Sequence, residues 1–198
     1  DKRAQGTGAL MLAVRNSFAD PLSEETLFEW HRLIMTGHRH VAAGQWRTHT
    51  EPIQVVSGAV GHERVHFEAP PSSRIPGEMG RFNRWFNDTA PDGPKAIRKA
   101  AVRSALAHLY FESIHPFEDG NGRIGRALSE KALSQELGQP ALLSLSRVIE
   151  AKRKEYYDAL KEGQQSNEVT PWVTWFVNMV LEAQIQAEEQ IEFTLKKT

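Results

Sequence analysis

The stretch of residues 115–126 constrains the fold more than any other part of the chain. It reads His-Pro-Phe-Glu-Asp-Gly-Asn-Gly-Arg-Ile-Gly-Arg. Pro116 disfavours helical backbone in the residue before it, so a preceding helix should end at His115. Gly120 and Gly122 permit positive φ and a close approach of the backbone to a ligand. The stretch therefore predicts a helix, a tight loop and a second helix.

The charged groups of this stretch gather at the start of the second helix, which we expect at Asn121. A helix N-terminus presents unpaired N–H groups and the positive end of a dipole, an arrangement that suits phosphate. His115 titrates near neutrality and can accept a proton from a hydroxyl, and Asp119 is a hard oxygen ligand suited to Mg²⁺. Arg123 and Arg126 are neighbours on one helix and can hold two phosphates of a chain. Together these groups predict transfer from a nucleotide to a hydroxyl.

The loop has three other possible interpretations. The tetrapeptide Asp-Gly-Asn-Gly alone is typical of an ordinary turn, and the two arginines alone are typical of a surface. A calcium loop counted from Asp119 fails, because the sixth position holds no glycine and Arg123 occupies a ligand position. A Walker phosphate loop fails because the chain has no Gly-Lys-Ser or Gly-Lys-Thr.

Composition limits the class of protein. The chain has 198 residues, 25% charged residues, a net charge of −1 and no cysteine. These values predict one globular domain, no global attraction to nucleic acid, no disulfides and a cytoplasmic location. No uninterrupted apolar run approaches the roughly 18 residues of a membrane span. We expect a lead-in at 1–20, a main domain at 21–185 with a hairpin at 50–68, and a truncated helix end at 186–198.

Two short β-branched segments interrupt an otherwise helical pattern. Ile53–Val56 and Val65–Phe67 are strand candidates, with glycines between them. A two-stranded hairpin is marginal alone, so it must lean on a helical body. The predicted helices are Ala9–Val14, a helix capped by Ser23 that stops at Gly37, Pro76–Asn87, Lys95–Ile114, Asn121–Leu137, one from Ser146 through Leu160, and one from Thr170. The predicted fold is an all-α bundle with one inserted β-hairpin.

The stretch 115–126 resembles the signature of the Fic (filamentation induced by cAMP) family, H-x-F-x-D-G-N-G-R-x-x-R, at every defined position. Leu22–Leu33, Gln54–Gly58, Val65–Pro70 and the pair Tyr156-Tyr157 extend the likeness, which is typical of a bacterial subgroup with an extra N-terminal region. The resemblance implies a helical bundle with a hairpin flap. It also implies a protein adenylyltransferase, which transfers AMP from ATP to a side-chain hydroxyl of a target protein.

The resemblance also assigns roles to residues. His115 would be the general base, Phe117 would pack into the core and aim the loop, and Asp119 would bind Mg²⁺. The ATP-binding residues would be Gly120, Asn121, Gly122 and Arg123 at the α- and β-phosphates, Arg126 at the γ-phosphate, and Tyr156 and Tyr157 near the adenine. For the two tyrosines, ordinary core packing is an equally good interpretation. The hairpin, about Ile53–Phe67, would pair with an extended target segment.

Many members of this family carry an inhibitory helix, [ST]-x-x-x-E-[GN], whose glutamate pairs with the last arginine of the signature. Here Ser146–Ala151 comes close, but alanine stands in the final position. In the similar subgroup the inhibitory helix lies upstream of Asp1. We therefore expect it in trans or in a preceding region, and expect the chain by itself to be deregulated.

Two further functions stay open at this stage. The same site can serve removal of AMP or transfer of another phosphate-containing group, or the chain can be a non-catalytic nucleotide- or peptide-binding module. Other side chains favour plainer interpretations. His108 is predicted to be a buried helix residue, and Trp46-Arg47 to pack rather than contact a target. The five histidines at 38, 40, 49, 62 and 66 are predicted to be surface residues of a loop rather than metal ligands.

Overall fold

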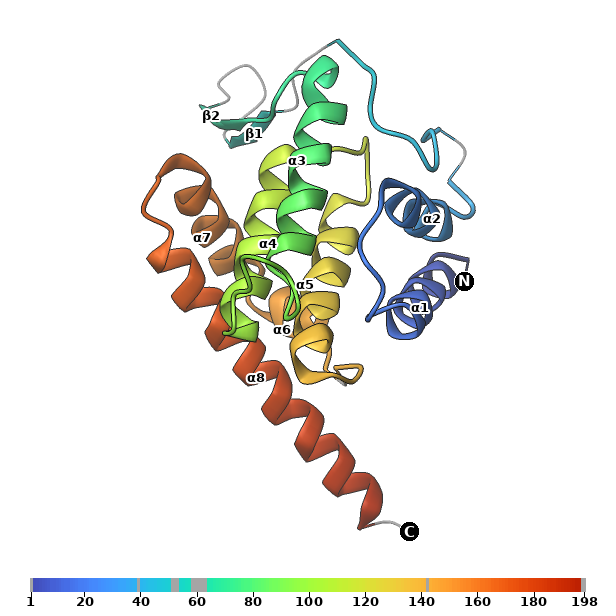
Figure 1. Cartoon of the computed structure of the whole chain (residues 1–198), viewed down its shortest axis with the longest axis vertical. Coiled ribbons are helices and arrows are strands. Elements are labelled where there is room, and N and C mark those ends of the chain that lie inside the picture. Colours follow the sequence, from blue (N-terminus) through green and yellow to red (C-terminus); the bar gives the residue numbers. More distant parts are fainter. Residues whose placement is uncertain (1, 39, 51–53, 58–63, 142, 197–198) are drawn as a thin grey trace.

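The computed structural model of the protein describes residues 2–38, 40–50, 54–57, 64–141 and 143–196. Within that part of the chain it has eight α-helices, one short 3₁₀-helix and a two-stranded antiparallel sheet (Figure 1). The elements are α1 (Lys2–Asn16), α2 (Glu24–Ile34), β1 (Gln54–Ser57), β2 (Arg64–Glu68), η1 (Ser72–Arg74), α3 (Ile75–Asp88), α4 (Ala100–Ile114), α5 (Asn121–Leu137), α6 (Leu145–Ala151), α7 (Arg153–Gln165) and α8 (Thr170–Leu195). The predicted all-α bundle with an inserted hairpin is confirmed.

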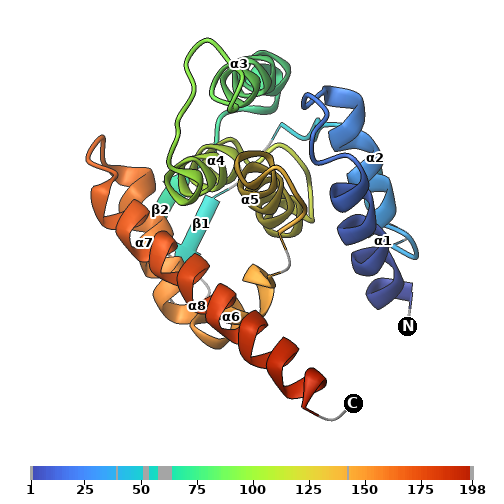
Figure 2. The same cartoon turned by 60° about the horizontal axis from the view of Figure 1, so that its bottom comes forward.

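Helices α4 and α5 form the centre of the bundle, and the other helices surround them (Figure 2). One core lies between this pair and α1, α2 and α3, and a second lies between the pair and α6, α7 and α8. Helix α4 contributes to both: Phe111 is buried in the first core and Leu109 in the second. The loop between α4 and α5 is therefore held by the two most enclosed helices of the molecule.

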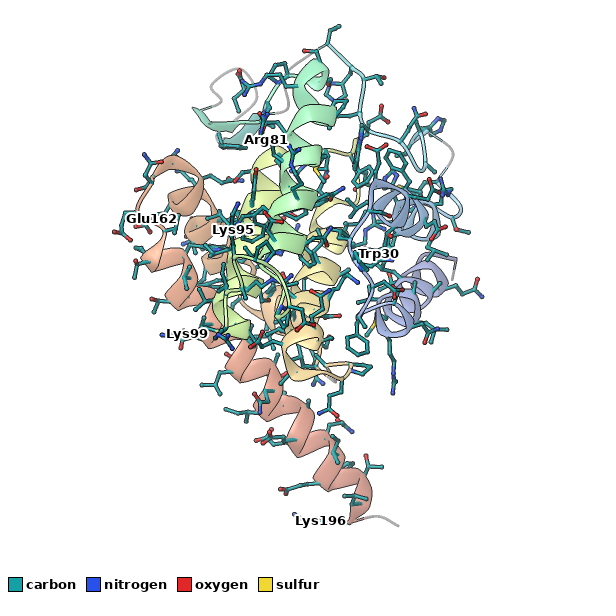
Figure 3. The ribbon with its side chains drawn as sticks, viewed as in Figure 1. Trp30, Arg81, Lys95, Lys99, Glu162 and Lys196 are labelled. Atoms are coloured by element: carbon teal, nitrogen blue, oxygen red, sulfur yellow. The ribbon has the colours of Figure 1, made fainter. Side chains whose placement is uncertain are left out.

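Helix α2 forms where its start signal predicts. The hydroxyl of Ser23 accepts a hydrogen bond from the Thr26 N–H at 3.1 Å, which satisfies one unpaired donor of the first turn. Leu27, Trp30 and Ile34 are buried along one face. Figure 3 shows Trp30 on α2, and its indole belongs to the first core.

Helix α1 is longer than the predicted Ala9–Val14 and packs on α2 and α5. Gly6 permits the contact with α2, because a Cβ there would lie 2.6 Å from the Leu33 carbonyl oxygen. The buried ammonium of Lys131 on α5 donates hydrogen bonds to the carbonyls of Ser17 and Phe18, just after α1 ends. The segment before residue 21 thus joins the core, and its assignment as a separate lead-in stays a prediction.

Lys131→Met is expected to lower the free energy of unfolding by about 1–3 kcal/mol, because two carbonyls at the end of α1 lose a charged donor. Urea unfolding measures the loss, and amide hydrogen exchange should show α1 opening first. The exposed Lys95, whose ammonium lies 3.3 Å from Asp88, is the control, and Lys95→Met should leave stability unchanged within error. Equal stability of Lys131→Met and wild type would contradict the anchoring role.

Two predicted helix boundaries are wrong. The helix expected from Lys95 begins instead at Ala100, because the preceding segment hydrogen-bonds to the end of α3. The N–H of Lys95 donates to the Asp88 carbonyl at 2.9 Å and that of Ile97 to the Thr89 carbonyl at 3.1 Å. The helix expected to run unbroken from Ser146 through Leu160 breaks at Lys152, whose φ of −118° and ψ of 35° separate α6 from α7.

The hairpin forms where the sequence predicts it. Strands β1 and β2 pair antiparallel, with Val55 opposite Phe67 and Ser57 opposite Arg64, and the register shifts at Val55/Val56. Strand β2 packs against α7, which supplies the support that a lone hairpin needs (Figure 1). Residues 51–53 and 58–63 of the predicted flap lie outside the described residues. None of the described helices is both long and apolar enough to cross a bilayer.

Candidate active site

His115 sits at the C-terminal end of α4 in an uncommon backbone conformation. Its φ of 51° and ψ of 59° are left-handed, and it is the one non-glycine among the described residues with positive φ. The helix ends there as the following proline predicts, and the His115 N–H still donates to the Phe111 carbonyl at 2.9 Å. Such a conformation costs energy and persists only where surrounding contacts fix it, so it marks a candidate functional residue.

Phe117 anchors the loop from inside the core, as predicted. Its ring is fully buried and stacks on the imidazole of His31 with centroids 4.0 Å apart, and it also contacts Trp46. Gly44 N–H donates to His31 Nδ1 at 2.9 Å, so the proton of the neutral ring is on Nε2, which donates to the Asp119 carbonyl at 3.1 Å. Helix α2 thereby supports both ends of the loop.

Arg47 holds the backbone at His115 from the opposite side. Its side chain is buried, with Nε donating to the His115 carbonyl at 2.8 Å and one terminal nitrogen to Ser72 Oγ at 2.9 Å. The other terminal nitrogen donates to the carbonyls of Pro70 and Ile114. Arg47 therefore connects the loop between α4 and α5 to the segment that follows β2. The predicted packing role of Arg47 is confirmed.

The turn into α5 depends on Gly120 and Asn121. Gly120 has a φ of 85°, and a Cβ there would lie 2.6 Å from Ile34 Cδ1, so both conformation and space require glycine. The buried amide of Asn121 accepts from the Phe117 N–H at 2.9 Å and donates to the Phe117 carbonyl at 2.8 Å. The Asn121 side chain thus shapes the loop, and what the residue can offer an anion is its backbone N–H in the first turn of α5.

A cavity of about 330 Å³ lies over this loop, between the start of α5 and the helices α6 and α7. It brings together all nine residues predicted for the site. Its lining consists of His115, Glu118, Asp119, Gly120, Asn121, Gly122, Arg123, Arg126, Ile149, Glu150, Arg153, Tyr156 and Tyr157. Residues from 115 to 157 therefore share one concave surface, and the contiguous loop forms its floor.

The side of this cavity formed by α5 is basic. The first turn of α5 supplies N–H groups that have no partner inside the helix. The Arg123 guanidinium lies 3.3 Å from Asp119 Oδ2, and Arg126 Nε donates to Ser146 Oγ at 2.9 Å. Glu150 lies 3.8 Å from the Arg153 guanidinium, and no salt bridge within the described residues joins it to Arg126. Arg126 thus keeps nitrogen donors for a ligand.

The two tyrosines occupy different environments. Tyr156 is buried in the second core, where its hydroxyl lies 2.9 Å from His108 Nε2 and its ring packs near Trp172. Tyr157 is half-exposed on the rim of the cavity, with the Arg153 guanidinium 5.9 Å from its ring centre. Tyr156 is thus a core aromatic that also lines the cavity. His108 is fully buried, as predicted, and burial lowers its pKa to about 3.

Burial changes the pKa of two titratable groups near the loop, His115 and Glu112. Burial, and then the positive charge of Arg47, lower the pKa of His115 to about 4, so the prediction that His115 titrates near neutrality is wrong. Burial raises the pKa of Glu112, one turn earlier on α4, to about 7 despite the opposing charge of Arg126. His115 is therefore uncharged at neutral pH, and about a quarter of its side chain is exposed. An uncharged, partly accessible imidazole is the form that can accept a proton.

Asp119 is the residue predicted to bind a divalent cation, and it lines the cavity together with Glu118 and Glu150. Its side chain is half-exposed, Oδ1 accepts from the Gly120 N–H at 2.6 Å, and Oδ2 faces Arg123. No group of three or more potential ligands occurs among the described residues. One carboxylate beside a helix N-terminus is compatible with Mg²⁺, which commonly takes one or two carboxylates and completes its shell with phosphates and water.

Sequence reasoning missed three residues that shape the site. His31, Glu112 and the bonding role of Arg47 come from segments with no motif of their own. The buried stripe of α2 included His31, and the pair Trp46-Arg47 was noticed, so these positions carried a packing signal. Glu112 carried a weaker one: a carboxylate three residues before the loop on a helix predicted to be buried.

Comparisons with known proteins show what the chain is similar to. A model of the Fic/DOC family matches residues 21–133, more than half of the chain. The protein adenylyltransferase Fic of Drosophila ananassae is 30% identical over 156 residues, which are 77% of this chain and 26% of that protein. The protein of the same name from Nematostella vectensis is 28% identical over 171 residues, 85% of this chain and 34% of that protein. The chain thus spans about a quarter to a third of the length of these relatives.

Solved structures share the fold. The crystal structure of a Fic family protein from Desulfovibrio desulfuricans has a TM-score of 0.72 and 27% identity, and the match covers 93% of this chain and 53% of that one. Fic-1 of Caenorhabditis elegans, with 22% identity, has a TM-score of 0.71 over 100% of this chain and 52% of its own. The helical bundle around the loop is therefore common to these proteins.

Proposed function

The chain belongs to the Fic/DOC family, and on that premise we propose that it is a protein adenylyltransferase, which transfers AMP from ATP to a hydroxyl side chain of a target protein. One observation carries the proposal: a single cavity places a neutral imidazole beside a helix N-terminus and two arginines. The curated relatives named protein adenylyltransferase support the same reaction. ATP is the donor substrate.

His115 is the general base of the proposed reaction. Its neutral imidazole takes the proton of the target hydroxyl, and the resulting oxygen attacks the α-phosphorus of ATP. The bond between the α-phosphorus and the bridging oxygen breaks, and pyrophosphate leaves. The products are the AMP-modified side chain, pyrophosphate and a protonated His115, which returns its proton to solvent before the next turnover.

The start of α5 holds the phosphates. The N–H groups of the first turn, the positive helix end and Arg123 face the α- and β-phosphates, and Arg126 takes the γ-phosphate. Gly120 and Gly122 let the phosphates approach the backbone, and Tyr157 with Tyr156 borders the adenine. Asp119 would hold Mg²⁺, which when bound supplies neutralisation of phosphate charge.

The hairpin of β1 and β2 is the docking site for the target. An extended target segment adds to its edge through main-chain hydrogen bonds, which need little sequence specificity. The contact of β2 with α7, together with the bonds from Arg47 to His115 and Pro70, links this edge to the cavity. The inhibitory helix in trans or in a preceding region stays a prediction.

The test uses ATP labelled at different phosphates. The protein is incubated with Mg²⁺, a bacterial lysate as the source of acceptor proteins, and ATP labelled at either the α- or the γ-phosphate. We expect label from the α-position alone to become protein-bound, and a chelator to abolish it. Label from the γ-position would identify a kinase and contradict the proposal, and so would the absence of label from both. Protein carrying His115→Asn serves as the blank.

Arg126→Ala is expected to weaken ATP binding by about 10- to 100-fold, because one charge-assisted contact to a phosphate is lost. Calorimetry with a non-hydrolysable ATP analogue measures the loss. ADP, which lacks the γ-phosphate, should bind the variant and the wild type equally. A matched loss of affinity for ADP would show that Arg126 does not serve the γ-phosphate.

A further inference from the structure

We propose that Glu112 is a positioning residue that orients the His115 imidazole and balances the charge this ring gains during transfer. The inference rests on the proposed function, because it concerns the same base. Glu112 lies on α4 one helical turn before His115, and its Oε2 is 3.7 Å from His115 Nδ1. The carboxyl group thus faces the ring nitrogen opposite the one that meets the substrate.

The surroundings of Glu112 leave one of its two carboxyl oxygens without a hydrogen-bond partner. Only 5% of the side chain is exposed, and Oε1 has no hydrogen-bond partner among the described residues. Helix α5 makes room for it, because a Cβ on Gly125 would lie 2.7 Å from that oxygen. An unpaired buried carboxyl oxygen costs stability, so a purely structural acid is a poor account of this position.

The charged and titratable groups around this pair come from several elements. Arg126 on α5 and Tyr156 on α7 interact electrostatically with Glu112. Arg47 and Asp119 act on His115, and Arg47 makes a positive charge on that ring less favourable. Of these neighbours, Asp119 is half-exposed and faces Arg123, which leaves Glu112 as the buried carboxyl group near the ring.

The orientation of the ring follows from the same helix turn. Nδ1 is the ring nitrogen that faces Glu112, 3.7 Å from its carboxyl oxygen, and the backbone of Glu112 also favours a proton on this ring. With the ring proton on Nδ1, Nε2 is the nitrogen that accepts a proton. When the target hydroxyl gives its proton to Nε2, the imidazole becomes a cation in a buried site next to Arg47. An ionised Glu112 carboxylate stabilises that cation, and its own proton count does not change.

The charge of Glu112 changes with pH, and the transfer rate should change with it. Because burial raises the pKa of Glu112 to about 7, the carboxyl group is mostly neutral at pH 5.5 and mostly charged at pH 8.5. The pKa of His115 is about 4, so the base itself stays neutral at both values. Stabilisation of the His115 cation by Glu112 should therefore be absent at pH 5.5 and present at pH 8.5.

The experiment compares Glu112→Gln with wild type at saturating Mg²⁺ and ATP. The ratio of the two kcat values cancels the effects of pH on ATP and acceptor. We expect a wild-type to variant ratio near 1 at pH 5.5 and roughly 10 or more at pH 8.5, with the KM for ATP unchanged. Glu112→Asp, which keeps the charge, should recover part of the rate. Equal ratios at both pH values, or a uniform loss of stability and ATP binding, would overturn the proposal.

Glu130→Gln is the matched control. Burial also raises the pKa of Glu130 to about 7, and the charge of Arg126 also acts on its carboxyl group. Unlike Glu112, the Glu130 carboxyl group accepts a hydrogen bond from the Leu145 backbone and does not face His115. The ratio of the wild-type kcat to the Glu130→Gln kcat should not change between pH 5.5 and pH 8.5. A change as large as that of Glu112→Gln would assign the effect to Arg126 and contradict the role of Glu112.

A second readout does not need the transfer reaction. Diethyl pyrocarbonate acylates neutral imidazoles, and peptide mass mapping gives the rate at His115 alone. In wild type the rate of His115 acylation, corrected for hydrolysis of the reagent, should rise between pH 5.5 and pH 8.5, because Glu112 becomes charged over that range. In Glu112→Gln this rate should not change with pH. Wild type that reacts in this way and yet transfers no AMP would refute the proposed function while the Glu112 inference stands. A flat wild-type rate would refute the inference.

Discussion

Arg47→Leu is expected to lower the free energy of unfolding by about 3–5 kcal/mol and to remove most of the transfer activity. The guanidinium is buried and donates to four oxygens, three of them backbone carbonyls at Ile114, His115 and Pro70. Hydrogen bonds from a charged group contribute about 1.5–3 kcal/mol each, and leucine leaves these carbonyls without a donor. The left-handed backbone of His115 then loses one of the contacts that fix it.

Two measurements check this prediction, namely chemical unfolding and transfer of label from ATP. Arg74→Gln is the control, because Arg74 is an exposed arginine from the neighbouring η1 that pairs with Glu78 at 2.8 Å. Exposed pairs contribute little, so this control should match wild type in both measurements. Wild-type stability of Arg47→Leu would show that the four bonds do not hold the loop.

The removal of Arg47 also acts on the base. Its positive charge lowers the pKa of His115, so the leucine variant should raise that pKa from about 4 toward its ordinary value. A base with a higher pKa is protonated over a wider acidic range, and residual activity of the variant should therefore fall at a higher pH than that of wild type. The position of that fall separates an electrostatic effect from a purely structural one.

Local signals in the sequence predicted most of the elements. The prolines, the glycines and the Ser23 cap predicted where α2, α5 and α8 begin and where α4 ends, because each acts within one helical turn. The start of α4 and the break at Lys152 were missed for a different reason. The segment before α4 hydrogen-bonds to the end of α3, and the break lies between two helices, α6 and α7, that each contact α8. Neither kind of contact leaves a pattern in the local sequence.

The residues of the candidate site also fall into those that local sequence predicts and those that only the fold brings together. Of the nine predicted residues, seven lie in the contiguous stretch 115–126, which spans the loop and the start of α5. The cavity unites these seven with Tyr156 and Tyr157. His31 and Arg47 reach this loop over 88 and 68 residues of chain. Such partners are selected by the three-dimensional packing of α2 and of the segment before β1. A single sequence predicted the candidate reacting groups, and the structure identified the groups that hold them.

His115→Asn is expected to lower kcat about 10²- to 10⁴-fold, the usual contribution of a general base, with ATP affinity unchanged. Asparagine is chosen because it tolerates the left-handed backbone that the site imposes, with φ at 51°. The variant therefore removes the base and keeps the shape of the loop. Label transferred from α-labelled ATP measures the rate, and calorimetry with a non-hydrolysable analogue measures the affinity.

His115→Ala separates the chemical role from the conformational one. It lacks the same base, but alanine in a left-handed conformation adds a backbone cost of about 1–2 kcal/mol. Both variants should therefore lose activity equally, and the alanine variant alone should also lose stability in urea unfolding. If the asparagine variant kept wild-type kcat, the proton of the target hydroxyl would have to leave by another route, and the base assignment would fail. If both lost ATP affinity, His115 would act in binding rather than in proton transfer.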